Sequence, residues 1–130
     1  GVGHAHMHLY VEAVPREAFD AWLAARQDAE LSELATQDTT HDGAREAFAT
    51  HCASCHRVAG VSQGDVGPNL SDIGSRTMLG AGVMAMEEGA VSQWLQQHQT
   101  LKPGNKMPAH DDIDKDTLDA LGAWLETLTP

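Results

Sequence analysis

The chain has 130 residues, which is the size of one domain with room for a modest extension. Its 8 Lys and Arg residues stand against 19 Asp and Glu residues, so the formal net charge is −11 with histidine neutral. Because nucleic acids and anionic lipids both attract basic surfaces, this charge argues against either partner. Hydrophobic residues make up 42% of the chain, enough for a real core, but aromatic residues only 5%. A core with so few large rings is thin, and we expect another group to complete it.

The first part of the chain predicts one strand and one helix. Tyr10 and the β-branched valines favour a strand over Met7–Val14, and Pro15 then precedes a helical pattern from Arg16 to about Leu34. This helix has an apolar stripe formed by Phe19, Trp22 and Leu23. We expect the stripe to be docked on the rest of the protein because it would otherwise be exposed. A polar, threonine-rich linker follows over residues 35–41. No apolar run approaches the ~20 residues that cross a bilayer, so we expect no membrane insertion of this chain.

The remaining residues predict an α domain. One helix begins near Asp42, a plausible N-cap, and runs to the cysteines, and the next runs from Glu87 or Glu88 to about Gln99. The last helix extends from about Asp114 to Leu128, and its inward residues are Leu118, Leu121, Trp124, Leu125 and Leu128. The intervening segments, 57–82 and 102–110, are rich in turn residues, and no strand pattern follows residue 41.

The motif that carries the chemistry is Cys52-Ala53-Ser54-Cys55-His56. A pair of cysteines two residues apart and followed by histidine is the c-type haem attachment pattern. The two thiols reach the two vinyl groups of one porphyrin, and His56 lies beneath the iron as proximal ligand. The porphyrin would also supply the bulk that the core lacks.

Two other interpretations of the cysteines are weaker. A thioredoxin-like redox pair is typical of a βαβ context, and the pattern here is helical. A zinc site needs further thiol or imidazole ligands at suitable spacing, and the chain has no other cysteine. For the sixth position of the iron, five methionines and seven other histidines are available, so residue type alone decides nothing.

Residues 42–130 resemble a class I cytochrome c. Phe48 lies four residues before Cys52, as in the N-terminal helix of that family. The segment 67–70 (Gly-Pro-Asn-Leu) is similar to the loop whose backbone carbonyl orients the proximal histidine, and 106–108 (Lys-Met-Pro) to the loop of the distal methionine. Leu121 and Trp124 match the positions where the C-terminal helix crosses the N-terminal one. The small residue that the family usually has four before Phe48 is Ala44 here, and Gly43 lies one place out of register.

This resemblance implies an all-α fold of three to five helices around one covalent haem c, with a short strand and an extra helix in front. His56 and Met107 are then the axial ligands, and Pro68 orients His56. A thioether ligand raises the reduction potential of the iron. Because both axial positions are filled, the haem suits electron transfer rather than catalysis. Among the other candidates, Met78, Met84 and Met86 are expected to lie in loops or pack in the core. We expect His51, His98 and His110 to be ordinary surface or loop residues. We expect Arg76 and Trp94 to bond the haem propionates or to pack.

The N-terminus resembles the end of the binuclear copper site in subunit II of haem–copper oxidases. His4 and Met7 fall on the histidine and methionine ligand positions, and the chain would begin just after the second bridging cysteine. The bridging cysteines are absent, so this copper site cannot form here. His4, His6 and His8 alternate and would share one face of a strand, where metal binding is adventitious at most.

Subunit II with a fused cytochrome c is the arrangement of caa(3)-type oxidases. The resemblance therefore implies a remnant of the copper domain with helix and linker over 1–41 and a cytochrome c domain over 42–130. That domain would accept electrons from a soluble periplasmic donor protein and pass them to the binuclear copper centre of its own subunit. It would lie on the outer face of the bacterial membrane as a carrier without catalytic residues.

Three alternatives stay open. The first is a free-standing periplasmic cytochrome c that serves another redox enzyme. The second is a haem sensor or peroxidase-like protein, which needs an open sixth position. The third is a copper-handling protein built on the N-terminal histidines and the methionines.

Overall fold

The computed structural model describes residues 11–31 and 39–130. Helix α1 (Arg16–Leu31) is present where the sequence predicts it, and its expected last residues lie outside the described part. The predicted strand over Met7–Val14 is wrong where it is described, because residues 11–14 have no regular structure. Val11 is 85% exposed, so no neighbouring strand covers it.

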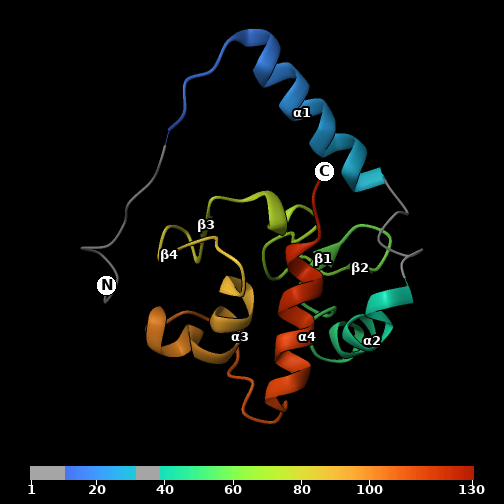
Figure 1. The fold of residues 1–130 in the computed structure, drawn as a ribbon, viewed down its shortest axis with the longest axis vertical. Helices are drawn as coiled ribbons and strands as arrows, with labels where there is room; N and C mark the ends of the chain where they lie inside the picture. The colour runs from blue at the N-terminus through green and yellow to red at the C-terminus, as the bar shows by residue number, and fades with distance from the viewer. Residues whose placement is uncertain (1–10, 32–38) are drawn as a thin grey trace.

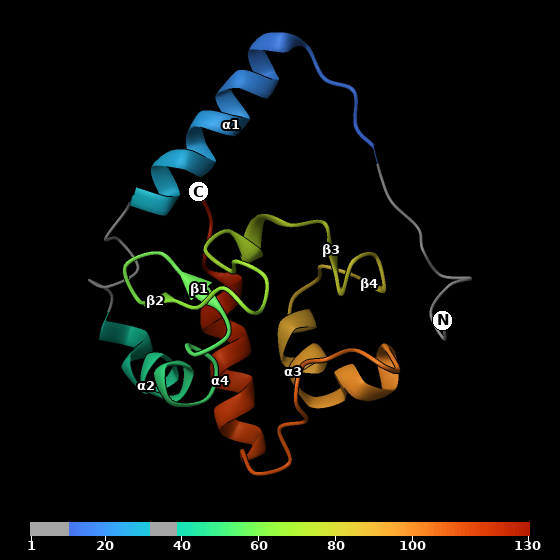
Figure 2. The ribbon, with the colours of Figure 1, turned by 180° about the vertical axis from the view of Figure 1, so that it is seen from behind.

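Three helices build the main body: α2 (Asp42–His51), α3 (Ala90–Leu101) and α4 (Lys115–Glu126). Helix α4 runs through the middle with α2 on one side and α3 on the other (Figures 1 and 2). Phe48 of α2 meets Trp124 of α4 edge-on, with ring centroids 5.3 Å apart. The inward residues predicted for the last helix are all buried: Leu118, Leu121, Trp124, Leu125 and Leu128. The predicted all-α fold class is confirmed.

The helices α3 and α4 approach each other closely at Gly122. A Cβ at this position would lie 2.6 Å from the backbone nitrogen of Ser92. The start of α3 is in turn capped by α4, because the Glu126 carboxylate accepts from the backbone N–H groups of Gly89 (3.1 Å) and Val91 (2.9 Å). A carboxylate satisfies free N–H groups and complements the positive end of the helix dipole.

The other helix ends differ in how well they were predicted. Asp114 caps α4, since its side chain accepts from the backbone N–H of Thr117. The predicted cap of α2 is wrong, because Asp42 is its first helical residue. His41, at the end of a short 3-10 turn η3 (Thr39–His41), holds the cap position, and its side chain does not accept from the N–H groups of the helix.

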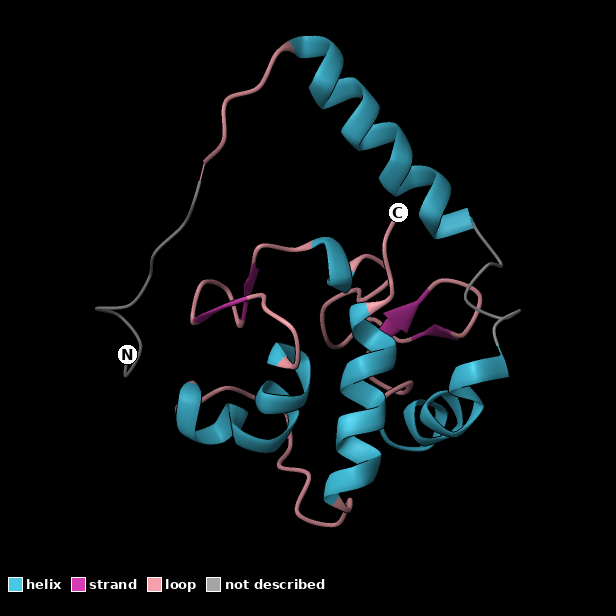
Figure 3. Cartoon of the chain, in the orientation of Figure 1, coloured by secondary structure: helices cyan, strands magenta, loops and turns pink. Residues whose placement is uncertain are grey.

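Two very short hairpins contradict the expectation of no strands after residue 41 (Figure 3). They pair β1 (Arg57–Val58) with β2 (Ser62–Gln63), and β3 (Met78–Leu79) with β4 (Met84–Ala85), both antiparallel. Strands of two residues carry no alternation to detect, and local turns form them. The second hairpin turns through Gly80, Ala81 and Gly82, all with positive φ. Between the hairpins lies a 3-10 turn, η4 (Ile73–Ser75).

Helix α1 stands apart from the three-helix body (Figure 1), so the expected docking of its apolar stripe is wrong. Phe19, Trp22 and Leu23 are 45%, 49% and 39% exposed. Phe19 and Trp22 stack on each other instead, with centroids 5.7 Å apart. The helix contacts the body through a polar residue, Arg26, which bonds to Asp72 and Ser75.

Within the described residues, no helix combines the length and the apolar character needed to span a membrane.

Candidate functional site

The cysteine segment continues directly from the end of α2. Backbone N–H groups of Cys52 and Ala53 both donate to the carbonyl of Phe48, and those of Cys55 and His56 donate back to Cys52. This pair of tight turns brings the two thiols and the His56 ring to one cavity. Cys52 is buried, Cys55 is partly exposed, and the two are not joined as a disulfide.

The surroundings of the Cys52 thiol disfavour a thiolate at this position. Burial, together with the neighbouring Cys55, raises the pKa of the Cys52 thiol to about 11. A thiol with such a pKa stays protonated at neutral pH, whereas redox exchange and zinc binding both use the thiolate. Among residues 11–31 and 39–130, no three His, Cys, Asp or Glu side chains are grouped to hold a metal ion.

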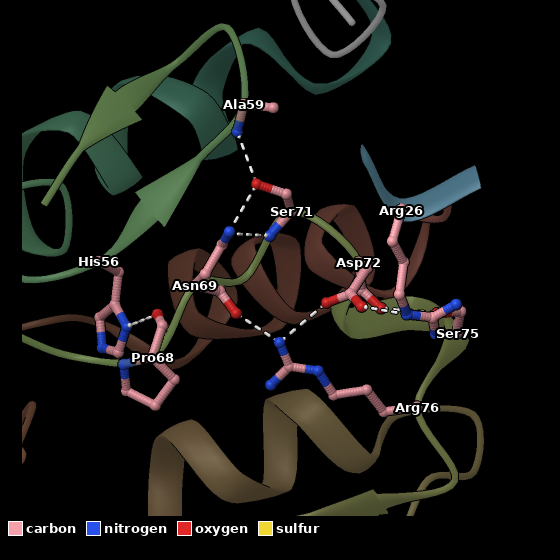
Figure 4. Close-up of polar contacts among 9 residues, drawn as sticks. All are labelled: Arg26, His56, Ala59, Pro68, Asn69, Ser71, Asp72, Ser75 and Arg76. Atoms are coloured by element: carbon pink, nitrogen blue, oxygen red, sulfur yellow. Dashed lines mark hydrogen bonds and ion pairs between the residues drawn. The ribbon is translucent and has the colours of Figure 1, made fainter. Parts of the chain in front are cut away.

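The ring of His56 is fixed by the loop that follows. Its Nδ1 lies 2.8 Å from the carbonyl oxygen of Pro68 (Figure 4). A carbonyl oxygen only accepts, so Nδ1 carries the hydrogen and donates it. The lone pair is therefore on Nε2, which is the form of histidine that binds a metal, with its other nitrogen held by a carbonyl.

Two glycines let the chain approach this segment. A Cβ on Gly67 would lie 2.5 Å from Cε1 of His56, and one on Gly64 would lie 2.6 Å from the backbone nitrogen of His56. The N–H of Gly67 also donates to the carbonyl of Cys55 at 2.7 Å. Side chains at these positions would push the loop away from the ring.

The loop that carries Pro68 is itself braced by hydrogen bonds (Figure 4). The Asn69 side chain accepts from the backbone and hydroxyl of Ser71, and the Ser71 hydroxyl accepts from the N–H of Ala59. The backbone carbonyl of Asn69 accepts from Arg76, which also pairs with Asp72 at 2.9 Å.

Met107 lies on a separate loop after α3. Its N–H donates to the Asn105 side chain at 3.0 Å, and the Asn105 amide donates to the carbonyls of His98 and Lys102. The side chain of Gln99 donates to the carbonyl of Met107. The last turn of α3 thus holds the loop in place.

His98 is a supporting residue that the sequence analysis misplaced at the surface. It is 2% exposed, and its Nε2 lies 3.0 Å from the carbonyl oxygen of Pro108, the residue after Met107. Its position could have been found, because Val91, Leu95 and His98 follow the i, i+4, i+7 spacing of one helix face. His51 is exposed as expected.

His110 packs beside His98, with ring centroids 5.3 Å apart. Burial lowers the pKa of His110, and repulsion from His98 lowers it further. Its Nε2 is buried and finds no partner among the described residues. The two rings back the loop that carries Met107, since His98 bonds to the carbonyl of Pro108.

One cavity of about 600 Å³ collects all seven residues singled out from the sequence: Cys52, Cys55, His56, Pro68, Arg76, Trp94 and Met107. Phe48, Ile73, Leu79 and Leu95 add apolar walls, as is usual for cofactor pockets of this volume. Of the other methionines, Met84 and Met86 pack against the core, and Met78 lines the cavity. His4, His6, Met7 and His8 lie outside the described residues.

The donor set of this cavity fits a c-type haem. Two thiols stand in the spacing that two vinyl groups need, an imidazole presents a free lone pair, and a thioether lines the same apolar space.

Comparison with known proteins gives a consistent result. The family model described as Cytochrome c matches residues 40–129. Cytochrome c oxidase subunit 2 of Bacillus sp. (strain PS3) is 32% identical over 133 residues, covering 98% of this chain and 36% of the relative. The same subunit of Alkalihalophilus pseudofirmus is 31% identical over 128 residues, which cover 98% of this chain and 36% of the relative. The subunit of Bacillus subtilis is 30% identical over 111 residues, which cover 82% of this chain and 30% of the relative. The chain thus spans about a third of the length of these relatives.

Proposed function

Because the chain belongs to the cytochrome c family, a family of haem-binding electron carriers, we propose that it transfers electrons within a terminal oxidase through one covalently bound haem c. Support comes from the cavity that gathers both thiols, His56 and Met107. Bound haem supplies an iron that alternates between the ferrous and ferric states. Residues 42–130 form the electron-carrying domain, and residues 1–41 belong to the preceding domain and its linker.

In this proposal the protein residues have distinct tasks. The thiols of Cys52 and Cys55 would hold the porphyrin by adding to its two vinyl groups, with sulfur on one carbon and the thiol hydrogen on the other, so attachment would need no oxidant. His56 Nε2 and the Met107 sulfur would bind the haem iron, and Pro68 holds His56 in its binding tautomer. Arg76 and Trp94, which line the cavity, would bond to the haem propionates.

With His56 and Met107 both bound to it, the haem iron would offer oxygen and peroxide no open site, and the surrounding residues would not need to move when its charge changes. This favours electron transfer over catalysis and over a sensor with an open position. The domain accepts electrons from a soluble donor and passes them to the binuclear copper centre of its own subunit, on the periplasmic face of the membrane. Tethering keeps the haem near that copper at high local concentration.

An absorption spectrum in both oxidation states tests the haem and its ligands. The ferric protein is expected to show the charge-transfer band of a thioether ligand, and Met107→Ala to lose it. Met78→Ala is the matched control, since Met78 lines the same cavity. Loss of the band in Met78→Ala alone would assign the ligand to Met78. Ready binding of carbon monoxide to the wild-type ferrous protein would contradict stable ligation by Met107.

Covalent attachment is tested separately by acidic solvent extraction. Haem should stay with the wild-type polypeptide and leave the Cys52→Ser, Cys55→Ser double variant. Haem that leaves the wild-type protein would contradict the two thioether bonds.

The alternative is a free-standing periplasmic cytochrome c that serves another redox enzyme. The oxidase assignment rests on similarity over 98% of this chain to two oxidase subunits. The gene sequence upstream of Gly1 distinguishes the two: two cysteines and two membrane helices support the oxidase subunit, and a cleaved signal peptide there would support the free carrier.

A further inference from the structure

Helix α1 contacts the main body through an ordered arginine (Figure 4). The Nε of Arg26 lies 3.0 Å from Oδ2 of Asp72, and its Nη2 donates to the hydroxyl of Ser75 at 3.1 Å. Its guanidinium carbon lies 4.2 Å from the centre of the Trp22 ring, one turn earlier on the same helix. The Arg26 and Asp72 side chains are only 24% and 22% exposed, so solvent screens this pair less than a surface ion pair.

Asp72 joins this contact to the cavity. Its second oxygen, Oδ1, accepts from Nη2 of Arg76 at 2.9 Å, so one carboxylate bridges two arginines from different elements. The same Nη2 donates to the backbone carbonyl of Asn69, the residue after Pro68. Arg76 also lines the cavity, and an arginine has further donors on Nη1 and Nε for a cavity anion. A continuous set of contacts therefore runs from α1 to the haem site.

The charge on this path depends on Arg26. With Arg26 in place, two guanidinium groups share one carboxylate, and the cluster carries a net positive charge. Without it, Asp72 pairs with Arg76 alone and cancels the positive charge beside the cavity. Oxidation adds a positive charge to the iron, so a positive neighbour favours the reduced form.

We propose that Arg26 is a positioning residue of the haem site, which acts through Asp72 and Arg76 and raises the reduction potential when α1 is docked. The inference rests on the proposed function, since it concerns the haem that this function uses. Coupling between two equilibria is reciprocal, so reduction of the haem strengthens the docking of α1. The helix outside the haem domain thereby responds to the redox state inside it.

The test is the midpoint potential of the holoprotein carrying Arg26→Gln. Arg16→Gln is the matched control, because it removes the same charge from the same helix while Arg16 pairs with Asp20 at the surface, with its side chain 83% exposed. Arg26→Gln is expected to lower the potential, Arg16→Gln to leave it unchanged, and Arg26→Lys to restore part of the shift. Equal shifts in the two Gln variants would reduce the effect to net charge and overturn the proposal.

Two further measurements separate this path from a general loss of structure. In an Asp72→Asn background, Arg26→Gln should shift the potential much less than in the wild type. Chymotrypsin should cut at Phe19 and Trp22 more slowly in the reduced than in the oxidised wild-type protein, and Arg26→Gln should abolish the difference. If Arg26→Gln has a normal haem spectrum and an unshifted potential, only this inference is overturned. The same holds if the wild-type protein is cut at equal rates in its two oxidation states. A wild-type protein that attaches no haem would instead overturn the proposed function.

Discussion

At the scale of single residues, Gly67 leaves no room for a side chain beside the His56 ring. We expect Gly67→Ala to push the ring from the Pro68 carbonyl, since the new Cβ would lie 2.5 Å from Cε1. Overpacking of this kind costs about 1–3 kcal/mol of stability. Denaturant unfolding measures the loss, and the haem spectrum should change with it.

Gly43→Ala is the matched control for that substitution. Gly43 lies in α2, and a Cβ there would meet nothing within 4 Å. Since alanine favours a helix over glycine, this variant should gain up to about 0.5–1 kcal/mol and leave the spectrum unchanged. Equal losses in both variants would contradict a specific role for Gly67.

His98 gives a second prediction at this scale. Replacing its ring by phenylalanine keeps the bulk but leaves the Pro108 carbonyl without its partner, at a cost of about 1–3 kcal/mol. The loop of Met107 should loosen, so we expect the thioether charge-transfer band to disappear at a lower pH on alkaline titration. The exposed His51→Phe is the control. An unchanged midpoint in His98→Phe would show that Gln99 and Asn105 hold the loop without it.

Sequence spacing was a good guide where chemistry is local. Cys52, Cys55 and His56 lie within five residues, so the motif alone brings them together. The pairing of Arg26 with Asp72 joins positions 46 residues apart and leaves no spacing pattern to read. His98 was missed because a polar residue type outweighed its place on the buried face of α3.

At the scale of elements, the cap of α4 makes stability depend on pH. Both carboxylate oxygens of Asp114 accept from Thr117, from its N–H at 2.9 Å and from its hydroxyl at 2.7 Å. These bonds lower the pKa of Asp114 below its ordinary value of 3.8. The folded state therefore gains from the carboxylate above that value, and the gain is lost as the pH falls through the lower, folded pKa.

We thus expect Asp114→Ala to melt at a lower temperature than the wild type at pH 7, and the difference to shrink as the pH falls below 3.8 and through the lower, folded pKa. Thermal melts over a pH series measure this. Asp116→Ala is the control, as Asp116 lies in the same first turn without being the cap. A difference in melting temperature that persists in strong acid would contradict the role of the ionised cap.

Among the elements, the helices were predictable and the short strands were not. The apolar spacing of α3 and α4 extends over several turns and places each helix within a few residues of its observed ends. The hairpin of β3 and β4 is set by three consecutive residues with positive φ and by Lys102, which donates to the carbonyl of Gly80 at 2.7 Å. The amphipathic pattern of α1 predicted a docked apolar stripe. This prediction was wrong because such a pattern does not tell which surface covers the stripe.

At the scale of the whole molecule, the net charge of −11 should govern encounters with the proposed electron donor. A basic donor should be attracted over a distance that shrinks from about 30 Å at 10 mM salt to about 10 Å at 100 mM. We expect the second-order rate of electron transfer from such a donor to fall about tenfold or more over this range. Stopped-flow reduction measures it, with a small neutral reductant as control. A rate independent of salt would contradict electrostatic attraction.

The brace around His56 also has a consequence for the order of assembly. His56 and Pro68 are only twelve residues apart, and Gly67 bonds back to Cys55 within the same short stretch. Short loops close early in folding because little chain entropy is lost, whereas Met107 must return from roughly fifty residues away. The half of the cavity that holds the cysteines can therefore form first and receive its cofactor through the side that the Met107 loop closes last.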